Sequence, residues 1–168
     1  MSAVLLALAL AGCASKPQAV VKHYSMQGDI KALDPTTKSA TINAGKIGDW
    51  MEAMTMEYPI KPDQDFAKLH VGDHIQATVV VSDLKYYVTD IARQYTMQGE
   101  IKALDPTAKS ATINAGKIGD WMAAMTMEYP VQPDQDFAKL HVGDHVQATV
   151  VVNDAKYYVT NIKVEPKQ

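Results

Sequence analysis

The amino-acid sequence predicts an all-β protein made of two tandem, small, five-stranded OB-like β-barrels. The chain has 168 residues, 47% hydrophobic and 21% charged, which is a globular composition. Residues 24–94 align with residues 95–165 at an offset of 71, and only 13 of the 71 positions differ. Each copy holds five short strand-like segments and no long amphipathic helix, a pattern typical of a small closed barrel. The period is too long for a solenoid unit, so each copy is expected to be a small domain.

The elements of the first copy can be assigned in chain order. Asp34-Pro35-Thr36-Thr37 is a turn signal that joins the first two strands into a hairpin. A loop with two glycines, residues 43–49, precedes the third strand, and residues 63–69 are expected to form one helical turn. The five strands are expected at residues 24–33, 38–43, 53–60, 74–81 and 85–92. No Gly/Ser linker separates the copies, which predicts two barrels in a fairly fixed relation.

The N-terminus carries features of a lipoprotein signal. An apolar run over residues 3–11 is too short to span a bilayer and ends in Leu10-Ala11-Gly12-Cys13, which resembles a bacterial lipobox. We therefore expect a signal peptide over residues 1–12, lipidation of Cys13, and a short tether over residues 13–23. The alternative is a fortuitous apolar N-terminus with a buried cysteine, because no Lys or Arg precedes the run.

These boundaries place the two barrels at residues 24–94 and 95–168. The protein is expected to be periplasmic and held by its lipid anchor, with the outer membrane as the expected membrane. The net charge is −3 and the chain has a single arginine, which argues against a nucleic-acid partner. Outside Cys13 there is no cysteine, and the sequence shows neither a nucleophile motif nor an acidic pair of evident purpose. An enzymatic function is therefore not expected.

Methionine is unusually frequent, with nine residues against two phenylalanines. Three of them in each copy follow a tryptophan closely, in the segments WMEAMTM (50–56) and WMAAMTM (121–127). Residues two apart on a strand face the same way, so Met54 and Met56 are expected side by side, with Met51 able to reach them from the preceding loop. Thioether sulfur prefers soft monovalent ions such as Cu(I) or Ag(I). The candidate metal ligands are Met51, Met54, Met56, Met122, Met125 and Met127.

Packing is the alternative role for these methionines, because methionine fills barrel cores readily. It accounts well for Met54 and Met56 if they face inward with Tyr58. It accounts less well for Met51, which follows a loop of acidic and glycine residues. His70 and His74 are four residues apart, but Val71-Gly72-Asp73 between them reads as a turn, so solvated turn histidines are expected there rather than ligands.

Each copy resembles the CusF family of periplasmic copper- and silver-binding proteins over essentially its whole length. The most specific parts are the Met-Thr-Met strand, the tryptophan loop before it and the Leu-x-Val-Gly-Asp turn. The resemblance implies a five-stranded OB-like barrel in which the two strand methionines and a histidine hold the ion and a tryptophan caps it through a cation–π contact. Met54, Met56, Met125 and Met127 match the methionine positions directly.

Two departures from the family pattern affect the ligand set. The histidine position falls on Ala44 and Ala115, and Met51 stands where the tryptophan is expected, with Trp50 one place earlier. We therefore predict a three-methionine site in which Met51 replaces the histidine. Trp50 and Trp121 are expected either to cap the ion or to form a hydrophobic lid.

The sequence thus predicts a copper-tolerance protein that buffers Cu(I) or Ag(I), or delivers it, with one site per repeat and a metal efflux component as a possible partner. The hypothesis from another class is an envelope interaction module without metal, in which the methionines pack the barrels.

Overall fold

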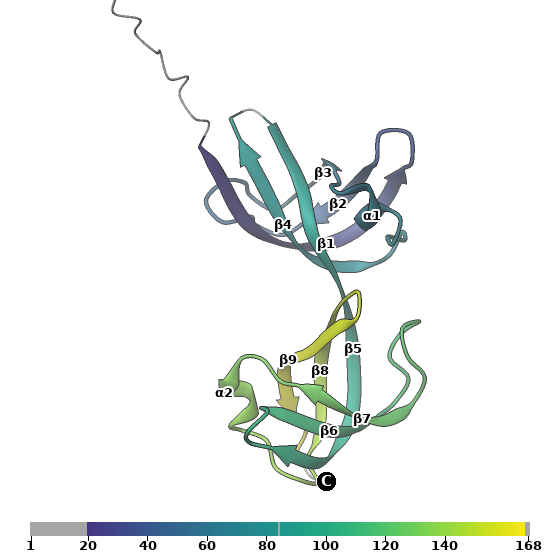
Figure 1. The fold of residues 1–168 in the computed structure, drawn as a ribbon, viewed down its shortest axis with the longest axis vertical. Coiled ribbons are helices and arrows are strands. Elements are labelled where there is room, and N and C mark those ends of the chain that lie inside the picture. The colour runs from purple at the N-terminus through teal and green to yellow at the C-terminus, as the bar shows by residue number, and fades with distance from the viewer. Residues whose placement is uncertain (1–19, 84, 167–168) are drawn as a thin grey trace, which may run out of the picture.

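A computed structural model describes residues 20–83 and 85–166 and shows an antiparallel all-β protein with two short helices (Figure 1). The all-β prediction is confirmed. Cys13, the expected signal peptide and most of the expected tether lie outside the described residues. The elements are β1 (Val21–Asp34), β2 (Ser39–Ala44), β3 (Met54–Pro59), α1 (Asp63–Phe66), β4 (His74–Ser82), β5 (Lys85–Asp105), β6 (Ser110–Ala115), β7 (Met125–Pro130), α2 (Asp134–Phe137), β8 (His145–Asn153) and β9 (Lys156–Val164).

Strand β5 belongs to both repeats, which the sequence did not reveal. Its first half pairs with β4 and its second half pairs with β6 and β8, so one sheet runs through the whole molecule. The described residues therefore hold nine strands, where the sequence suggested ten separate ones. Strand β1 also begins at Val21, three residues earlier than expected, because Val21 to His23 pair with the end of β4. The helical turn predicted after the third strand is present as α1.

The sheet of the first repeat has the order β3-β2-β1-β4-β5, and its ladder is not closed. Among the described residues, the backbone pairing between the end of β3 and β5 is limited to an isolated parallel bridge between Ile60, just after β3, and Val88, where the Lys61 N–H donates to the Val88 carbonyl at 2.8 Å. Val131 and Val159 make the same bridge in the second repeat. The continuous OB-like barrel thus stays a prediction.

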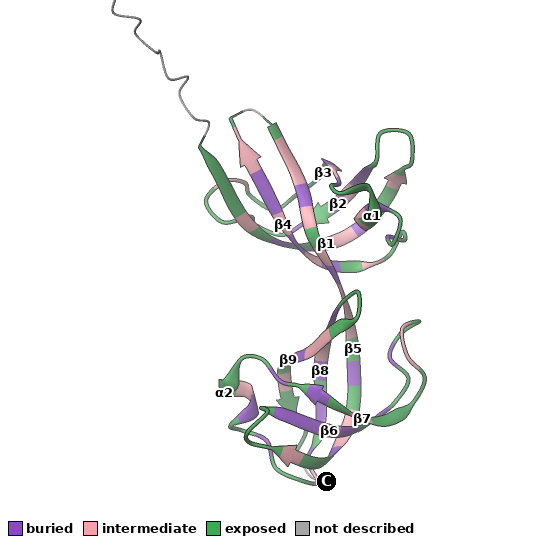
Figure 2. Cartoon of the chain, viewed as in Figure 1, coloured by how far each residue is buried: buried purple, intermediate pink, exposed green. Residues whose placement is uncertain are grey.

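Each repeat has its own hydrophobic core, as the buried bands along the strands show (Figure 2). Strand β4 illustrates the cause: its alternate residues Ile75, Ala77 and Val79 are all buried, as the two-residue period of a strand requires. Burying such side chains contributes roughly 25 cal/mol per Å² of apolar surface, which makes the two cores the main source of stability. None of the helices among the described residues has the length and apolar character that a bilayer crossing requires.

The two repeats are joined by more than the chain connection. Arg93 of β5 pairs with Ile75 of β4 on one side and with Val152 of β8 on the other. An ion pair between Lys68, just after α1, and Asp154, in the β8–β9 turn, links the repeats a second time. These contacts support the expected fixed relation between the copies.

Candidate metal centre

The Met-Thr-Met segment forms the start of β3 and faces the core. In the register between β2 and β3, Met54 lies opposite Ala44, Met56 opposite Ile42, and Tyr58 opposite Ala40. Exposure falls along this face from Met54 at 48%, through a half-buried Met56, to Tyr58 at 0%. The two thioethers therefore line the place where the core opens to solvent. Met125, Met127 and Tyr129 repeat the arrangement on β7.

The core-facing partner of Met54 is Ala44, so no imidazole stands where the resemblance expects a histidine. Ala115 has the same place opposite Met125. Within the described residues no group of three His, Cys, Asp or Glu side chains comes together in a way that could hold a metal ion.

The histidines singled out in the sequence are surface residues near β4. The Nδ1 atom of His74 lies 2.6 Å from a carboxylate oxygen of Asp29, and the His70 backbone N–H donates to the Asp73 carboxylate at 2.8 Å. The hydrogen bond from His74 lowers the pKa of Asp29. Both histidine side chains are more than half exposed, which matches the expectation of solvated turn residues.

The loop that carries Met51 is a tight turn closed by backbone hydrogen bonds. The Ile47 N–H donates to the Met51 carbonyl at 2.8 Å, and Ile47 itself is fully buried. Gly48 has φ +50°, and a Cβ there would lie 2.9 Å from the Tyr24 ring. Glycine is needed at this turn both for its backbone conformation and for its close approach to the ring.

Met51 reaches into the core from this loop. Its Sδ atom accepts a hydrogen bond from the hydroxyl of Tyr58 at 3.7 Å, and Met122 and Tyr129 make the same contact at 3.8 Å. Burial raises the pKa of Tyr58, so its hydroxyl keeps its proton and acts as the donor. Because Tyr58 is on the same core face of β3 as Met54 and Met56, this contact joins the Met51 loop to the strand that carries them. Tyr58 continues the alternation of Met54 and Met56, which is the signal by which the sequence could have identified its role.

Trp50 belongs to a row of aromatic rings that the sequence analysis missed. Its ring stacks on Tyr24 with centroids 6.1 Å apart at 17°, and it lies 5.6 Å from Tyr86, which in turn packs edge-on against Tyr58 at 5.9 Å. Trp121 has an equivalent set of neighbours in the second repeat. The packing of the indole against two tyrosine rings favours the hydrophobic-lid interpretation.

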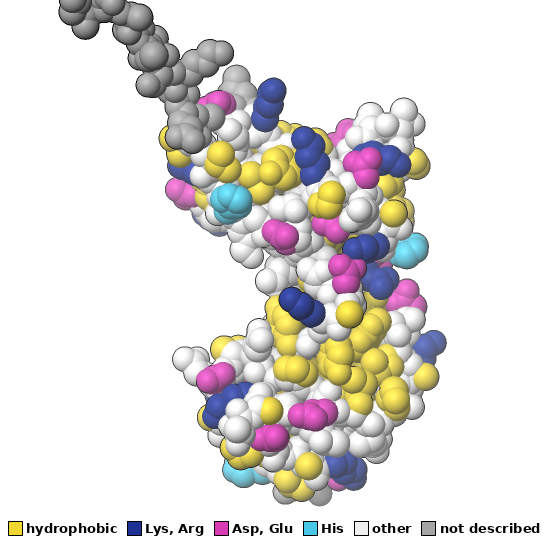
Figure 3. Space-filling model, viewed as in Figure 1, with side chains coloured by type: hydrophobic (Ala, Val, Ile, Leu, Met, Phe, Trp, Pro, Cys, Tyr) yellow, Lys and Arg dark blue, Asp and Glu magenta, His cyan; other side chains and the backbone are white. Residues whose placement is uncertain are grey.

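The second copy of this aromatic row lies at the junction between the repeats. Tyr95, the counterpart of Tyr24, stacks on Trp121 and has the Arg93 guanidinium 5.6 Å from its ring centroid. Its hydroxyl is buried with no hydrogen-bond partner among residues 20–83 and 85–166, and this burial raises the pKa of Tyr95 to about 12. Figure 3 shows hydrophobic side chains gathered in a patch on the face of the second repeat that is turned toward the viewer.

The charges beside the two methionine clusters differ. In the first repeat Lys46 and Glu52 form an ion pair at 2.6 Å, with both side chains well exposed. Their counterparts in the second repeat are Lys117 and Ala123. Lys117 makes no ion pair within residues 20–83 and 85–166. With Asp49 and Asp120 included, residues 46–52 carry a net charge of −1, whereas residues 117–123 are neutral overall.

The fold and the donor set define a class, an all-β protein with a thioether-bearing strand at the open end of each of two cores. The model of one family, described as copper binding periplasmic protein CusF, matches residues 23–93 and again residues 94–164, so the chain belongs to this family. No curated protein matches the chain. The family function is periplasmic binding of copper and silver ions by a chaperone-type protein, not by an enzyme.

We predict that Gly48→Ala lowers the free energy of unfolding by about 1–2 kcal/mol. The left-handed backbone conformation is unfavourable for alanine, and the new Cβ would clash with the Tyr24 ring. Displacement of Tyr24 should also shift the fluorescence of the stacked Trp50. Urea unfolding followed by fluorescence measures both effects. The matched control is Gly45→Ala, where the nearest atom to a new Cβ is 3.8 Å away and stability should change little. Equal stability of the two variants would contradict the assigned role of Gly48.

Proposed function

We propose that the chain binds one Cu(I) or Ag(I) ion in each repeat through three methionine thioethers and buffers or delivers the ion in copper tolerance. The ligands are Met51, Met54 and Met56 in the first repeat and Met122, Met125 and Met127 in the second. The observation that carries the proposal is the hydrogen bond of Met51 to Tyr58, which lies on the same face of β3 as Met54 and Met56. In this proposal each repeat is an OB-like barrel, closed where β3 and β5 meet.

The chemistry of this donor set favours exchange of the ion over permanent storage. Thioethers are neutral and soft, so they bind Cu(I) and Ag(I) without releasing protons, and they discriminate against zinc, magnesium and calcium. Met54 is half exposed, which lets an incoming or outgoing ion reach the first sulfur from solvent. Met51 can keep its contact with Tyr58 while it binds metal, because a thioether sulfur has a second lone pair.

Trp50 and Trp121 serve in this proposal mainly as lids that keep water from the sulfurs. A cation–π contact to a bound ion would add roughly 0.5–2 kcal/mol, but it needs a ring face within about 6 Å of the ion. Tyr24 stacks on the Trp50 ring, so only the opposite face could serve, and Tyr86 lies tilted toward that ring.

We also propose that Cys13 carries a lipid that anchors the protein to the membrane facing the periplasm, the outer membrane being our expectation. The sequence Leu10-Ala11-Gly12-Cys13 supports this proposal. A Cys13→Ser variant should move from the membrane fraction to the soluble fraction while binding Ag(I) as before. Unchanged fractionation would refute lipid anchoring without affecting the metal proposal. A metal efflux component remains the proposed partner for delivery.

The metal proposal predicts a stoichiometry. Native protein should bind about two Ag(I) or, under anaerobic conditions, about two Cu(I) per chain, and no Zn(II) with comparable affinity. Met54→Leu/Met56→Leu should reduce this to about one, because leucine keeps the apolar volume and removes the soft donor. The matched control is Met26→Leu, which changes a methionine that is 1% exposed in the same core and should keep both sites. Unchanged silver content of the double variant would favour the interaction-module hypothesis.

The charge difference between the loops predicts unequal sites. One unit charge at about 8 Å in an effective dielectric near 40 is worth about 1 kcal/mol, or about fivefold in affinity, and the exposure of the Lys46–Glu52 pair makes this an upper value. The first repeat should bind more tightly at low salt. Glu52→Ala should bring its affinity close to that of the second repeat, and Ala123→Glu should strengthen the second.

Silver titration of these full-length variants at low and high ionic strength tests the inequality, which salt should reduce. Two equal sites in the native protein at low salt would show that the loop charges do not act on the ion.

A further inference from the structure

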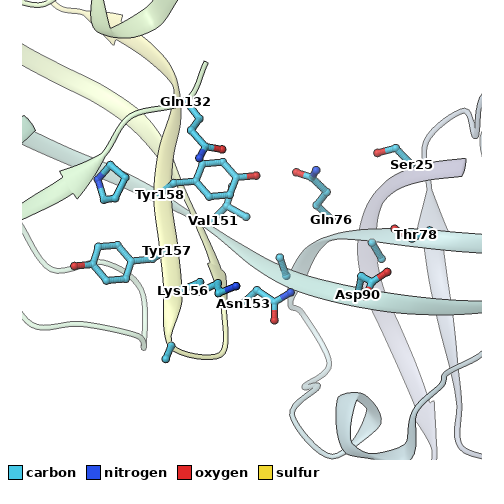
Figure 4. Close-up of a pocket in the computed structure, with 14 residues that line it drawn as sticks. Ser25, Gln76, Thr78, Asp90, Gln132, Val151, Asn153, Lys156, Tyr157 and Tyr158 are labelled. Carbon is cyan, nitrogen blue, oxygen red and sulfur yellow. The ribbon is translucent and has the colours of Figure 1, made fainter. Parts of the chain in front are cut away.

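Residues of both repeats line a cleft of about 700 Å³, and one of them, Tyr157, also packs against Trp121 of the second aromatic row. Strands β1, β4 and β5 of the first repeat contribute one wall, and the β8–β9 hairpin with the segment after β7 contributes the other. Gln76 of the first repeat faces Tyr158 and Gln132 of the second across the opening (Figure 4). A neighbouring hollow of about 720 Å³ shares these three residues, so the two form one groove.

The groove is unusually rich in side-chain amides. Six of its lining residues are Gln or Asn, namely Gln27, Gln76, Gln94, Gln132, Asn153 and Asn161. The Gln94 amide donates to the Gln76 oxygen at 3.1 Å. The amides of Gln132, Asn153 and Asn161 have no side-chain hydrogen-bond partner within the described residues. They are therefore available to a ligand.

The differences between the two copies concentrate at this groove. The two copies differ at 13 aligned positions, and at seven of these a residue of one copy or the other lines the groove. By contrast, the methionine segments 50–56 and 121–127 differ at one position, Glu52 against Ala123. The seven groove members are Ser25, Asp90, Ala92, Gln94, Gln132, Asn153 and Ala155, with Asn161 as the counterpart of Asp90. The groove has thus diverged while the methionine cluster has stayed nearly constant.

Two of these differences exchange a charge for an amide on the wall of the second repeat. Gln132 replaces Lys61, and Asn161 replaces Asp90. In the first repeat the Lys61 ammonium lies 5.1 Å from the centroid of the Tyr87 ring. Tyr158, the counterpart of Tyr87, has Gln132 in place of that cation and lines the groove. The change leaves an aromatic ring beside neutral donors and acceptors.

We propose that this groove binds a neutral oligosaccharide. An amide side chain both donates and accepts hydrogen bonds, as the hydroxyl and acetamido groups of a sugar do, and a tyrosine ring can cover the apolar face of a sugar ring. The volume suits a ligand of a few sugar residues. The charged residues of the lining are Asp90, Asp134 and Lys156, which do not form a field of one sign that would select an ionic ligand. An extended peptide would instead be held through main-chain hydrogen bonds to a free strand edge, whereas this groove presents side chains from several strands.

The test uses the full chain without metal, so its result is independent of the metal proposal. The probe is chitotetraose, a neutral oligomer of N-acetylglucosamine, titrated by NMR or calorimetry. We expect saturable binding with a Kd of about 1 mM or below. Gln132→Lys/Asn161→Asp should weaken binding at least about tenfold, since it restores the charges of the first repeat. The fold should accept both residues, because the first repeat holds Lys61 and Asp90 at the same places and Asp90, like Asn161, has a positive φ.

The matched control is Lys61→Gln, which makes the reverse exchange outside the groove and should leave the affinity for chitotetraose unchanged. Thermal unfolding of all variants verifies that they are folded. Absence of saturable binding to the native protein would overturn the proposal, and so would equal affinity of Gln132→Lys/Asn161→Asp. Binding of a neutral extended peptide at the same residues in place of the sugar would identify a different ligand class and would also overturn it.

Discussion

The register between β2 and β3 is the constraint on which the rest of the site depends. It places Met54, Met56 and Tyr58 on the core face of β3, opposite Ala44, Ile42 and Ala40. A shift of one residue would turn the thioethers outward and bring Thr55 and Glu57 into the core. The fully buried Tyr58 opposes such a shift through its packing. Its hydroxyl also donates a hydrogen bond to the Met51 sulfur. The same interactions that stabilise each core therefore fix the face of β3 on which the proposed strand ligands lie.

Much of this arrangement could be predicted from local sequence patterns. The two-residue period predicted the strands and the shared face of Met54 and Met56, and the close similarity of the two copies predicted that each feature would occur twice. The row of aromatic rings could not be predicted, because Tyr24, Trp50 and Tyr86 are far apart in the sequence and meet only through the fold. The continuity of β5 was also hidden, since a strand that ends one repeat and a strand that begins the next have the same local pattern.

The duplication gives two nearly identical methionine clusters in different surroundings. Tyr24 lies in the first strand near the start of the described chain, whereas Tyr95 is at the junction, under Arg93 and with its hydroxyl buried. The loop charges differ as well, through Glu52 and Ala123. Under the proposed function, one donor set in two environments can give two affinities without any change of ligand.

The donor atoms of the bound ion are the centre of this account, and X-ray absorption spectroscopy at the copper edge of the Cu(I)-loaded protein observes them directly. The account predicts a first shell of sulfur alone, with about three scatterers per copper and no imidazole signature, because Ala44 and Ala115 stand where a histidine would be. A shell that contains histidine nitrogen, or fewer than two sulfurs per copper, would contradict the three-methionine site.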